Sequence, residues 1–158
     1  MLFKQTRIGK NGHPFTIYKL RSIPKDASQP NAWGVFLRKT KWDELPQLFN
    51  LLKGEMTLVG PRPDVPGYAD LLLGDDRIIL TVKPGITGLA SLKYRNEEQL
   101  LAQQPNPKHY NDEVIWPDKV RINKWYAAHR TLAMDFLILW YTFVPVSFDV
   151  EAYMESKK

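Results

Sequence analysis

The chain has 158 residues, about the length of one ordinary domain, and its 44% apolar and 25% charged residues are typical of a globular protein. It contains no cysteine, which excludes disulfides and thiolate metal sites. Its 22 Lys and Arg against 17 Asp and Glu give a formal net charge of +5, which favours anionic partners such as phosphorylated substrates, nucleic acid or an acidic membrane surface.

The first 22 residues predict a β-hairpin with basic side chains. Apolar and polar residues alternate over residues 15–20, and Gly9-Lys10-Asn11-Gly12 is a turn signal between two short strands. The first five residues contain no apolar stretch of the kind that forms a signal peptide or a membrane anchor.

A helix start is predicted around an acidic pair, Asp43 and Glu44. Thr40 is a plausible N-cap because Asp43 follows it by three positions. Pro46 disturbs that helix, since an interior proline removes a hydrogen bond and clashes with the preceding turn. Either the helix kinks, or a second helix begins at Pro46 and ends at Gly54. Both alternatives place the acidic pair at or near a helix N-terminus.

The central segments predict two short strands and a helix. Residues 56–59 and 78–82 read as strands, and residues 65–73 read as a helix. Lys83-Pro84-Gly85 is a turn signal, with Gly85 at the position where a type II turn needs a positive φ.

The last third of the chain is predicted to be mainly helical. Residues 96–103 read as a helix, residues 106–117 as irregular, and residues 118–143 as a long helix that is broken or bent near His129. Because the strand signals are short and unevenly separated, we expect no long parallel sheet. The chain as a whole, residues 1–158, is predicted to be a single domain of mixed α/β (α+β) class, with several helices, a few short strands and extensive loops.

The acidic pair is the first candidate for chemistry. Adjacent side chains lie about 100° apart on a helix, so Asp43 and Glu44 are not expected to share one role. In phosphoryl transfer, one carboxylate can attack phosphorus while another holds a metal ion or orients a group. The alternative is a solvated pair that helps to start a helix.

Basic residues near this pair are candidates for binding phosphate. Arg38 lies five residues before Asp43, and Arg62 lies between two prolines that stiffen its backbone. A planar guanidinium can bind two phosphate oxygens at once, but a rigid surface turn explains Arg62 equally. Lys19 and Arg21 alternate on the second predicted strand and face the same way, either as a phosphate contact or as an exposed strand face.

An apolar run near the C-terminus, residues 132–146, follows a group of basic residues. It contains Asp135 and spans about 15 residues, whereas crossing a bilayer takes about 20 apolar residues. Basic groups beside an aromatic-rich segment of this length suit a helix that lies in a membrane interface. Core packing is the alternative.

Several other site types find no support in the sequence. His13, His109 and His129 are far apart and lack the spacing of metal ligands. No GxGxxG, Walker A or nucleophile-elbow pattern occurs, and no recognised nucleic-acid motif accompanies the dispersed charges, so no nucleic-acid partner is expected.

Six segments taken together resemble the monotopic phosphoglycosyl transferases, also called the bacterial sugar transferase family. The resemblance covers essentially the whole chain, and the Asp-Glu-Leu-Pro-Gln and Gly-Pro-Arg-Pro blocks are its specific parts. In chain order the segments are Phe3-Lys4-Gln5-Thr6-Arg7-Ile8-Gly9, Tyr18-Lys19-Leu20-Arg21-Ser22, Leu37-Arg38-Lys39-Thr40, Asp43-Glu44-Leu45-Pro46-Gln47, Leu58-Val59-Gly60-Pro61-Arg62-Pro63 and Lys83-Pro84-Gly85-Ile86-Thr87-Gly88.

The resemblance implies a two-step phosphoglycosyl transfer at the first membrane step of bacterial glycoconjugate synthesis. Asp43 would attack the sugar-side phosphorus of a UDP-sugar and release UMP, and polyprenyl (undecaprenyl) phosphate would then accept the sugar phosphate. Glu44 is similar to the family's magnesium-associated glutamate, and the Mg²⁺ site would include Asp43. Lys19, Arg38 and Arg62 match the basic positions expected around the phosphates.

Further candidate site residues are Arg21, Lys83 and Arg95, the last as a sugar contact after the turn at residues 83–85. A catalytically silent scaffold that binds nucleotide sugar or anionic lipid is the alternative function.

The resemblance also implies a location. Family members have an apolar re-entrant helix before the position of Leu2, which holds them on the cytoplasmic face of the bacterial inner membrane. The present chain begins where that helix would end, so we interpret it as a truncated catalytic domain that is itself soluble. Contact with the membrane would then depend on that missing helix and on the amphipathic C-terminal segment.

Overall fold

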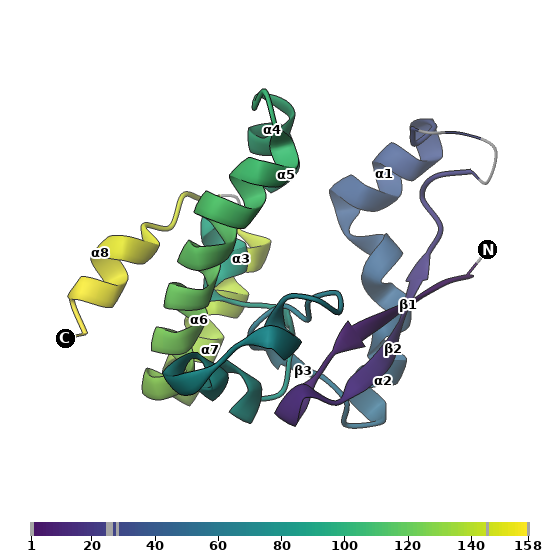
Figure 1. Cartoon of the computed structure of the whole chain (residues 1–158). Coiled ribbons are helices and arrows are strands. Elements are labelled where there is room, and N and C mark those ends of the chain that lie inside the picture. Colours follow the sequence, from purple (N-terminus) through teal and green to yellow (C-terminus); the bar gives the residue numbers. More distant parts are fainter. Residues whose placement is uncertain (1, 25–26, 28, 145, 158) are drawn as a thin grey trace.

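The computed structural model describes residues 2–24, 27, 29–144 and 146–157, and these form the expected mixture of helices and short strands (Figure 1). The strands make two separate two-stranded sheets, and helices account for most of the remainder. The predicted α+β class is therefore confirmed.

The predicted hairpin is confirmed. Strand β1 (Leu2–Ile8) pairs antiparallel with β2 (Pro14–Leu20), in a register that places Arg7 opposite Phe15. The connecting turn contains a short 3-10 helix, Lys10–Gly12, in which Asn11 and Gly12 have φ values of 58° and 80°. Arg21 follows the end of β2.

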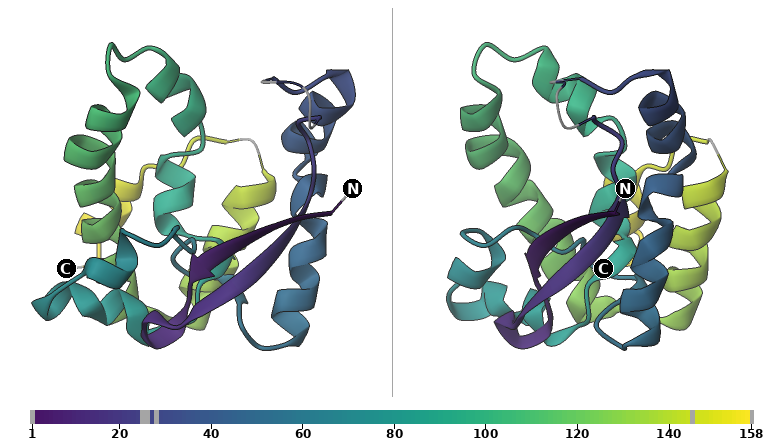
Figure 2. Two further views of the ribbon diagram at one scale, coloured as in Figure 1. Left: turned by 45° about the vertical axis from the view of Figure 1, so that its right-hand side comes forward. Right: turned by 90° about the vertical axis from the view of Figure 1, so that its right-hand side faces the viewer.

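Three helical segments follow in a column beside the hairpin (Figure 2). They are α1 (Ala32–Thr40), the 3-10 helix η2 (Trp42–Gln47) and α2 (Leu48–Leu52). The predicted N-cap at Thr40 is wrong, because α1 begins earlier, with the Asn31 side chain accepting from Gly34 N at 2.9 Å. Thr40 ends that helix, and its hydroxyl donates to the Phe36 carbonyl at 2.8 Å.

The acidic pair nevertheless lies in the first turn of a helix, as predicted. Pro46 is tolerated because η2 is a short 3-10 segment and α2 begins only at Leu48. Gly54, with a φ of 73°, follows the end of α2.

Strand β3 (Thr57–Val59) forms as predicted and pairs parallel with β4 (Gly85–Thr87). The prediction for Gly85 is wrong, since this residue lies in a strand and does not have a positive φ. A different constraint acts there: a Cβ on Gly85 would lie 2.2 Å from the Gly60 nitrogen.

Two other central predictions are wrong. Residues 65–73 contain only a short 3-10 helix, η3 (Ala69–Leu71), and the expected strand at 78–82 belongs to another, η4 (Gly74–Thr81). A short apolar run does not distinguish a strand from a buried helical turn, and here Ile79 and Leu80 are buried in a helical turn that contacts α6.

The C-terminal half is helical and contains the break expected near His129. Residues 106–117 are helical, not irregular, because the Asn106 side chain caps the helix that follows, accepting from His109 N at 3.1 Å. The helical segments are α3 (Leu89–Lys93), α4 (Glu97–Ala102), α5 (Pro107–Tyr110), a π-helical turn η5 (Asn111–Ile115), α6 (Trp116–His129), α7 (Leu132–Phe143) and α8 (Val150–Glu155).

The main core joins β3 to the C-terminal helices. Val59, Ile122, Tyr126 and Ile138 are among its buried members, and the Tyr126 hydroxyl donates to Asp135 Oδ1 at 2.5 Å. Because Val59, the last residue of β3, is buried in this core, the turn at residues 60–63 begins from a fixed backbone position.

Core packing, one of the two alternatives that the sequence left open for this segment, is confirmed for one face of helix α7. The helix buries Met134 and Ile138 in the core and exposes a second apolar stripe. Within the described part of the chain, no helix is both long enough and apolar enough to span a bilayer.

Candidate active site

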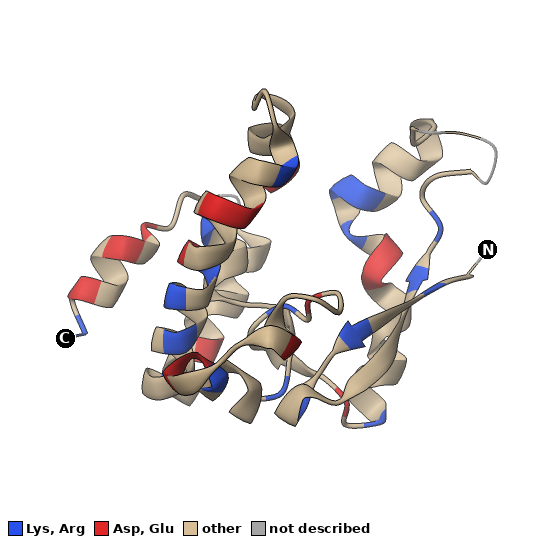
Figure 3. Cartoon of the chain, viewed as in Figure 1, with Lys and Arg blue, Asp and Glu red and all other residues tan. Residues whose placement is uncertain are grey.

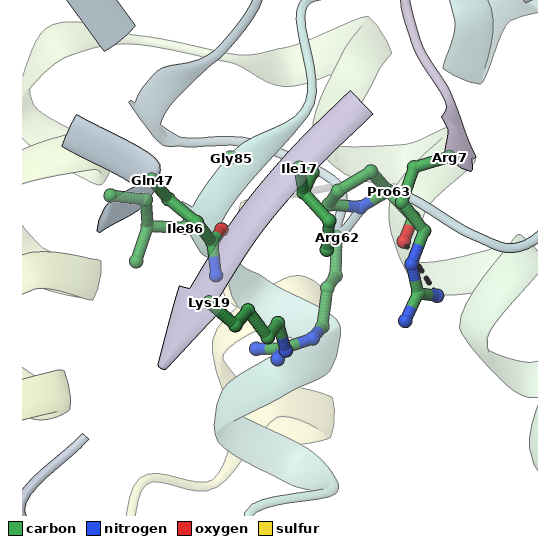
Figure 4. A pocket seen from close by; sticks show the side chains of 8 residues that line it. All are labelled: Arg7, Ile17, Lys19, Gln47, Arg62, Pro63, Gly85 and Ile86. Atoms are coloured by element: carbon green, nitrogen blue, oxygen red, sulfur yellow. Dashed lines mark hydrogen bonds between the residues drawn. The ribbon is translucent and has the colours of Figure 1, made fainter. Parts of the chain in front are cut away.

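Side chains from three segments meet at the Glu44 carboxylate. Lys19 of β2 donates to Glu44 Oε1 at 3.3 Å, and Arg62, from the turn after β3, donates to the same oxygen. The Glu44 side chain is 11% exposed, whereas that of Arg62 is 45% exposed. Figure 4 shows the ends of the Lys19 and Arg62 side chains next to each other. The structure thus brings together three of the residues predicted from sequence.

The electrostatics of this cluster favour an ionised Glu44. Burial opposes ionisation, but the charges of Arg62 and Lys19 outweigh it and lower the pKa of Glu44. Burial and the nearby Arg62 guanidinium lower the pKa of Lys19. Glu44 therefore holds two cations close to one point.

Asp43 has a different environment from its neighbour. It is partly buried, and burial followed by the charge of Glu44 raises the pKa of Asp43, against the opposite influence of Lys19 and Arg38. No ion pair or side-chain hydrogen bond joins its carboxylate to another described residue, and a hydrogen bond from its own backbone also lowers its pKa. Figure 3 shows this acidic segment between α1 and α2, with basic segments of α1 and the hairpin nearby. Asp43 is thus the carboxylate of the pair whose oxygens are not held by a cation.

The turn that carries Arg62 is fixed by close backbone contacts. Gly60 N donates to Thr87 O at 2.9 Å, and Gly85 N donates to Pro61 O at 2.8 Å. These bonds, together with the two prolines beside Arg62, fix the backbone position from which the Arg62 side chain extends.

Arg7 also lies at this site, although it was not among the site residues predicted from the sequence. Its Nη1 donates to Pro63 O at 3.3 Å, and its guanidinium lines a small pocket together with Lys19, Gln47 and Arg62 (Figure 4). Strand alternation could have predicted this position. In the hairpin register Arg7 pairs with Phe15, and Phe15 lies on the same strand face as Lys19.

The pocket beneath these cations is small. Its cavity volume of about 10 Å³ has room for roughly one water molecule. A group larger than a water molecule does not fit inside this pocket.

The other predicted residues are less closely tied to the pair. Arg38 lies close enough to influence Asp43, and its Nε donates to Ser22 Oγ at 3.0 Å. Arg95 donates to the Tyr141 carbonyl. Arg38 is thus held near Asp43, while Arg95 is held by α7.

Two of the candidates are placed elsewhere. Arg21 stacks over the Phe3 ring, 5.6 Å from its centroid. Lys83 is exposed, and its Nζ lies 3.5 Å from the position of a Cβ on Gly54, beyond the end of α2. The structure therefore does not bring these two to the acidic pair.

Asp43 and Glu44 have the chemistry needed to share a magnesium ion. Mg²⁺ is commonly held by one or two carboxylates, with substrate phosphates and water supplying the remaining ligands. In the described ranges no three His, Cys, Asp or Glu side chains converge on one point. The residues present fit an ion that is shared with phosphate.

Asp64, two residues after Arg62, gives a testable pH dependence. Burial raises the pKa of Asp64 to about 6, against the influence of Lys119, Arg7 and Arg62. Because its unfolded value is about 3.9, the folded state binds more protons than the unfolded state between about pH 4 and pH 6. The free energy of unfolding is therefore expected to fall as the pH rises through this window.

Asp64→Asn should remove that loss, because the neutral amide stands in for the protonated acid. We expect the variant to exceed the natural protein in unfolding free energy by up to about 3 kcal/mol above pH 6, and by little near pH 4. Urea unfolding at several pH values measures the difference. A difference in unfolding free energy that is the same at every pH would show that Asp64 is not the titrating group.

Comparison with known proteins identifies relatives over most of the chain. The family model described as bacterial sugar transferase matches residues 1–149. The sugar transferase EpsL of Bacillus subtilis, whose name calls it uncharacterized, is 34% identical over 152 residues, covering 90% of this chain and 67% of that protein.

Two further relatives have more specific names. The undecaprenyl-phosphate galactose phosphotransferase of Salmonella typhimurium is 33% identical, over 89% of this chain and 32% of that protein. The UDP-glucose:undecaprenyl-phosphate glucose-1-phosphate transferase of Klebsiella pneumoniae is 36% identical, over 70% of this chain and 27% of that protein. The chain thus spans about a third or less of the length of these two relatives.

Proposed function

The chain belongs to the bacterial sugar transferase family, and we propose that it transfers a sugar 1-phosphate from a UDP-sugar to undecaprenyl phosphate. The names of the Salmonella and Klebsiella relatives support this reaction class. One observation carries the proposal: Asp43, whose carboxylate makes no ion pair with any described residue, lies beside a glutamate that holds Lys19 and Arg62 together.

The first step assigns the nucleophile to Asp43. Its carboxylate oxygen attacks the sugar-side phosphorus, the bond from this phosphorus to the bridging oxygen breaks, and UMP leaves with that oxygen. The product is a sugar phosphate bound to Asp43 through an acyl phosphate bond. Arg62 and Lys19 neutralise charge on the transferring group, which is the main requirement of phosphoryl transfer.

In the second step the phosphate oxygen of undecaprenyl phosphate attacks the same phosphorus. The bond to Asp43 breaks, its carboxylate is restored, and a lipid-linked diphosphate sugar leaves. The bond between C1 of the sugar and its oxygen is never broken, so the anomeric configuration is retained.

Asp43 and Glu44 would hold the magnesium ion together with the donor's phosphate oxygens. When bound, the ion supplies positive charge to the phosphates and lines up the displacement. Glu44 also accepts hydrogen bonds from Lys19 and Arg62, and in this proposal it holds both cations ready for the transferring phosphate.

A panel of UDP-sugars tests the proposed function directly. We expect one UMP per enzyme molecule with the correct sugar and Mg²⁺, and no UMP when EDTA is added. Absence of UMP with every donor would contradict the transferase assignment. UMP release in the presence of EDTA would contradict the requirement for magnesium.

Membrane contact by α7 is a further part of the proposal. Its exposed apolar stripe is Leu132, Phe136, Trp140 and Phe143, and each of these residues is at least 65% exposed. Aromatic side chains with this exposure suit a helix that lies in a membrane interface.

Replacing Trp140 and Phe143 by Ser should weaken binding to anionic phosphatidylglycerol vesicles by at least about tenfold, because each aromatic loses its apolar contact with lipid. Vesicle co-sedimentation measures this loss. The control replaces Leu71 and Leu73 by Ser, since these residues are similarly exposed, at 67% and 79%, in and beside η3. Equal losses in both double variants would contradict a specific role for α7.

A further inference from the structure

Lys41 has a backbone conformation that lysine rarely adopts. Its φ of 56° and ψ of 21° lie in the left-handed region, and in the described part of the chain Asn11 is the only other non-glycine residue with a positive φ. Asparagine tolerates this region, whereas a lysine Cβ crowds the following carbonyl. Glycine is the usual residue at such a helix end. The end of α1 therefore does not by itself explain a lysine.

This residue is the junction between α1 and the acidic pair. Its backbone N–H donates to Arg38 O at 3.3 Å and closes α1, while its carbonyl accepts from Glu44 N at 3.1 Å and opens η2. The turn thus presents the Lys41 side chain two residues before Asp43.

The surroundings of the Lys41 ammonium come from three separate segments. It lies within electrostatic range of Glu44, Asp43, Arg62 and Arg95. The residue is exposed and directly precedes the η2 segment that carries the acidic pair.

The neighbouring cations already have partners. Lys19 and Arg62 donate to the Glu44 carboxylate, and Arg95 donates to a main-chain carbonyl of α7. For the Lys41 ammonium, no hydrogen bond or ion pair is formed with any residue that the structure describes. It is a cation beside the dyad that remains available to an incoming anion.

We propose that Lys41 binds the diphosphate of the nucleotide substrate, and that its left-handed conformation is kept for this contact at a cost in stability. The inference rests on the proposed transferase function and adds a phosphate-binding residue to it. A lysine with no binding role would show the same gain in stability when replaced by glycine, but no loss of binding.

Lys41→Gly separates stability from binding. Glycine relieves the backbone crowding, so we expect the Tm to rise by about 2–4 °C. Removal of the ammonium should weaken binding of UDP with Mg²⁺, and of inorganic pyrophosphate, by about tenfold. Isothermal titration calorimetry and thermal unfolding measure the two effects. Lys41→Arg, which retains both charge and crowding, should keep the natural Tm and most of the binding.

Two control variants isolate the causes. Asn11→Gly relieves the other positive φ, in the hairpin turn, and should leave binding unchanged. Lys39→Ala removes the same charge two positions away and should also leave binding unchanged.

The possible results are distinct. Binding of both probes by Lys41→Gly as tight as that of the natural protein overturns the proposal, and a lower Tm overturns the part that concerns strain. If both probes bind through Lys41 but UMP is never released, the transferase function fails and the binding role of Lys41 stands. If the natural protein binds neither probe, both fail.

Discussion

Asp43→Asn is expected to abolish both UMP release and the covalent sugar phosphate. The amide oxygen is a poor nucleophile towards phosphorus, so the rate of UMP release should fall by at least about a thousandfold. The loss should not come from unfolding, because burial, followed by the charge of Glu44, raises the pKa of Asp43 and a neutral side chain is tolerated there. Single-turnover UMP release and the mass of the intact protein measure the two effects.

The matched control is Asp75→Asn. Asp75 is an exposed carboxylate in η4, away from the acidic pair, and the variant should release UMP at the natural rate. UMP release by Asp43→Asn at a rate similar to this control would remove the nucleophile role from Asp43. A covalent adduct that persists in Asp43→Asn would move the role to another residue.

Gly88→Ala is expected to destabilise the protein by roughly 3 kcal/mol, because a Cβ there has no room. It would lie 2.2 Å from the Gly60 carbonyl oxygen and 3.0 Å from its carbon, both of them backbone atoms. Neither can move without disturbing the turn that positions Arg62. The midpoint of urea unfolding measures the loss, and any folded variant should also show weaker UDP binding.

Gly74→Ala provides the comparison. Gly74 has a φ of 56° with open space around it, so alanine there costs about 1 kcal/mol through backbone conformation alone. Gly88 has an extended φ of −170°, which any residue adopts. A smaller loss for Gly88→Ala than for Gly74→Ala would contradict the argument from close backbone approach.

Local signals were sufficient for several elements. The alternation in residues 15–20 and the turn at residues 9–12 predicted the hairpin, and the break near His129 was also found. The apolar run containing Ile79 was assigned to a strand, but it folds as a 3-10 helix because its packing partner is α6. Such a partner is distant in sequence, and a short apolar run fits either structure.

The site likewise contains some residues that the sequence predicted and others that only the structure revealed. Asp43, Glu44, Lys19 and Arg62 were candidates from their residue types and motifs, while Arg7 and Lys41 were not. Arg7 reaches the site through strand pairing and a bond to Pro63. Lys41 is distinguished by its positive φ, and the residue type lysine does not predict that conformation.

The sequence by itself determined the composition class, the hairpin, the acidic pair at a helix start and the family. These depend on residue types and on neighbours within a few positions. Only the tertiary structure decided that one oxygen of Glu44 accepts from both Lys19 and Arg62, and that Gly85 and Gly88 make room for Gly60. These features depend on contacts between residues 18 to 28 positions apart, and local propensity does not specify such contacts.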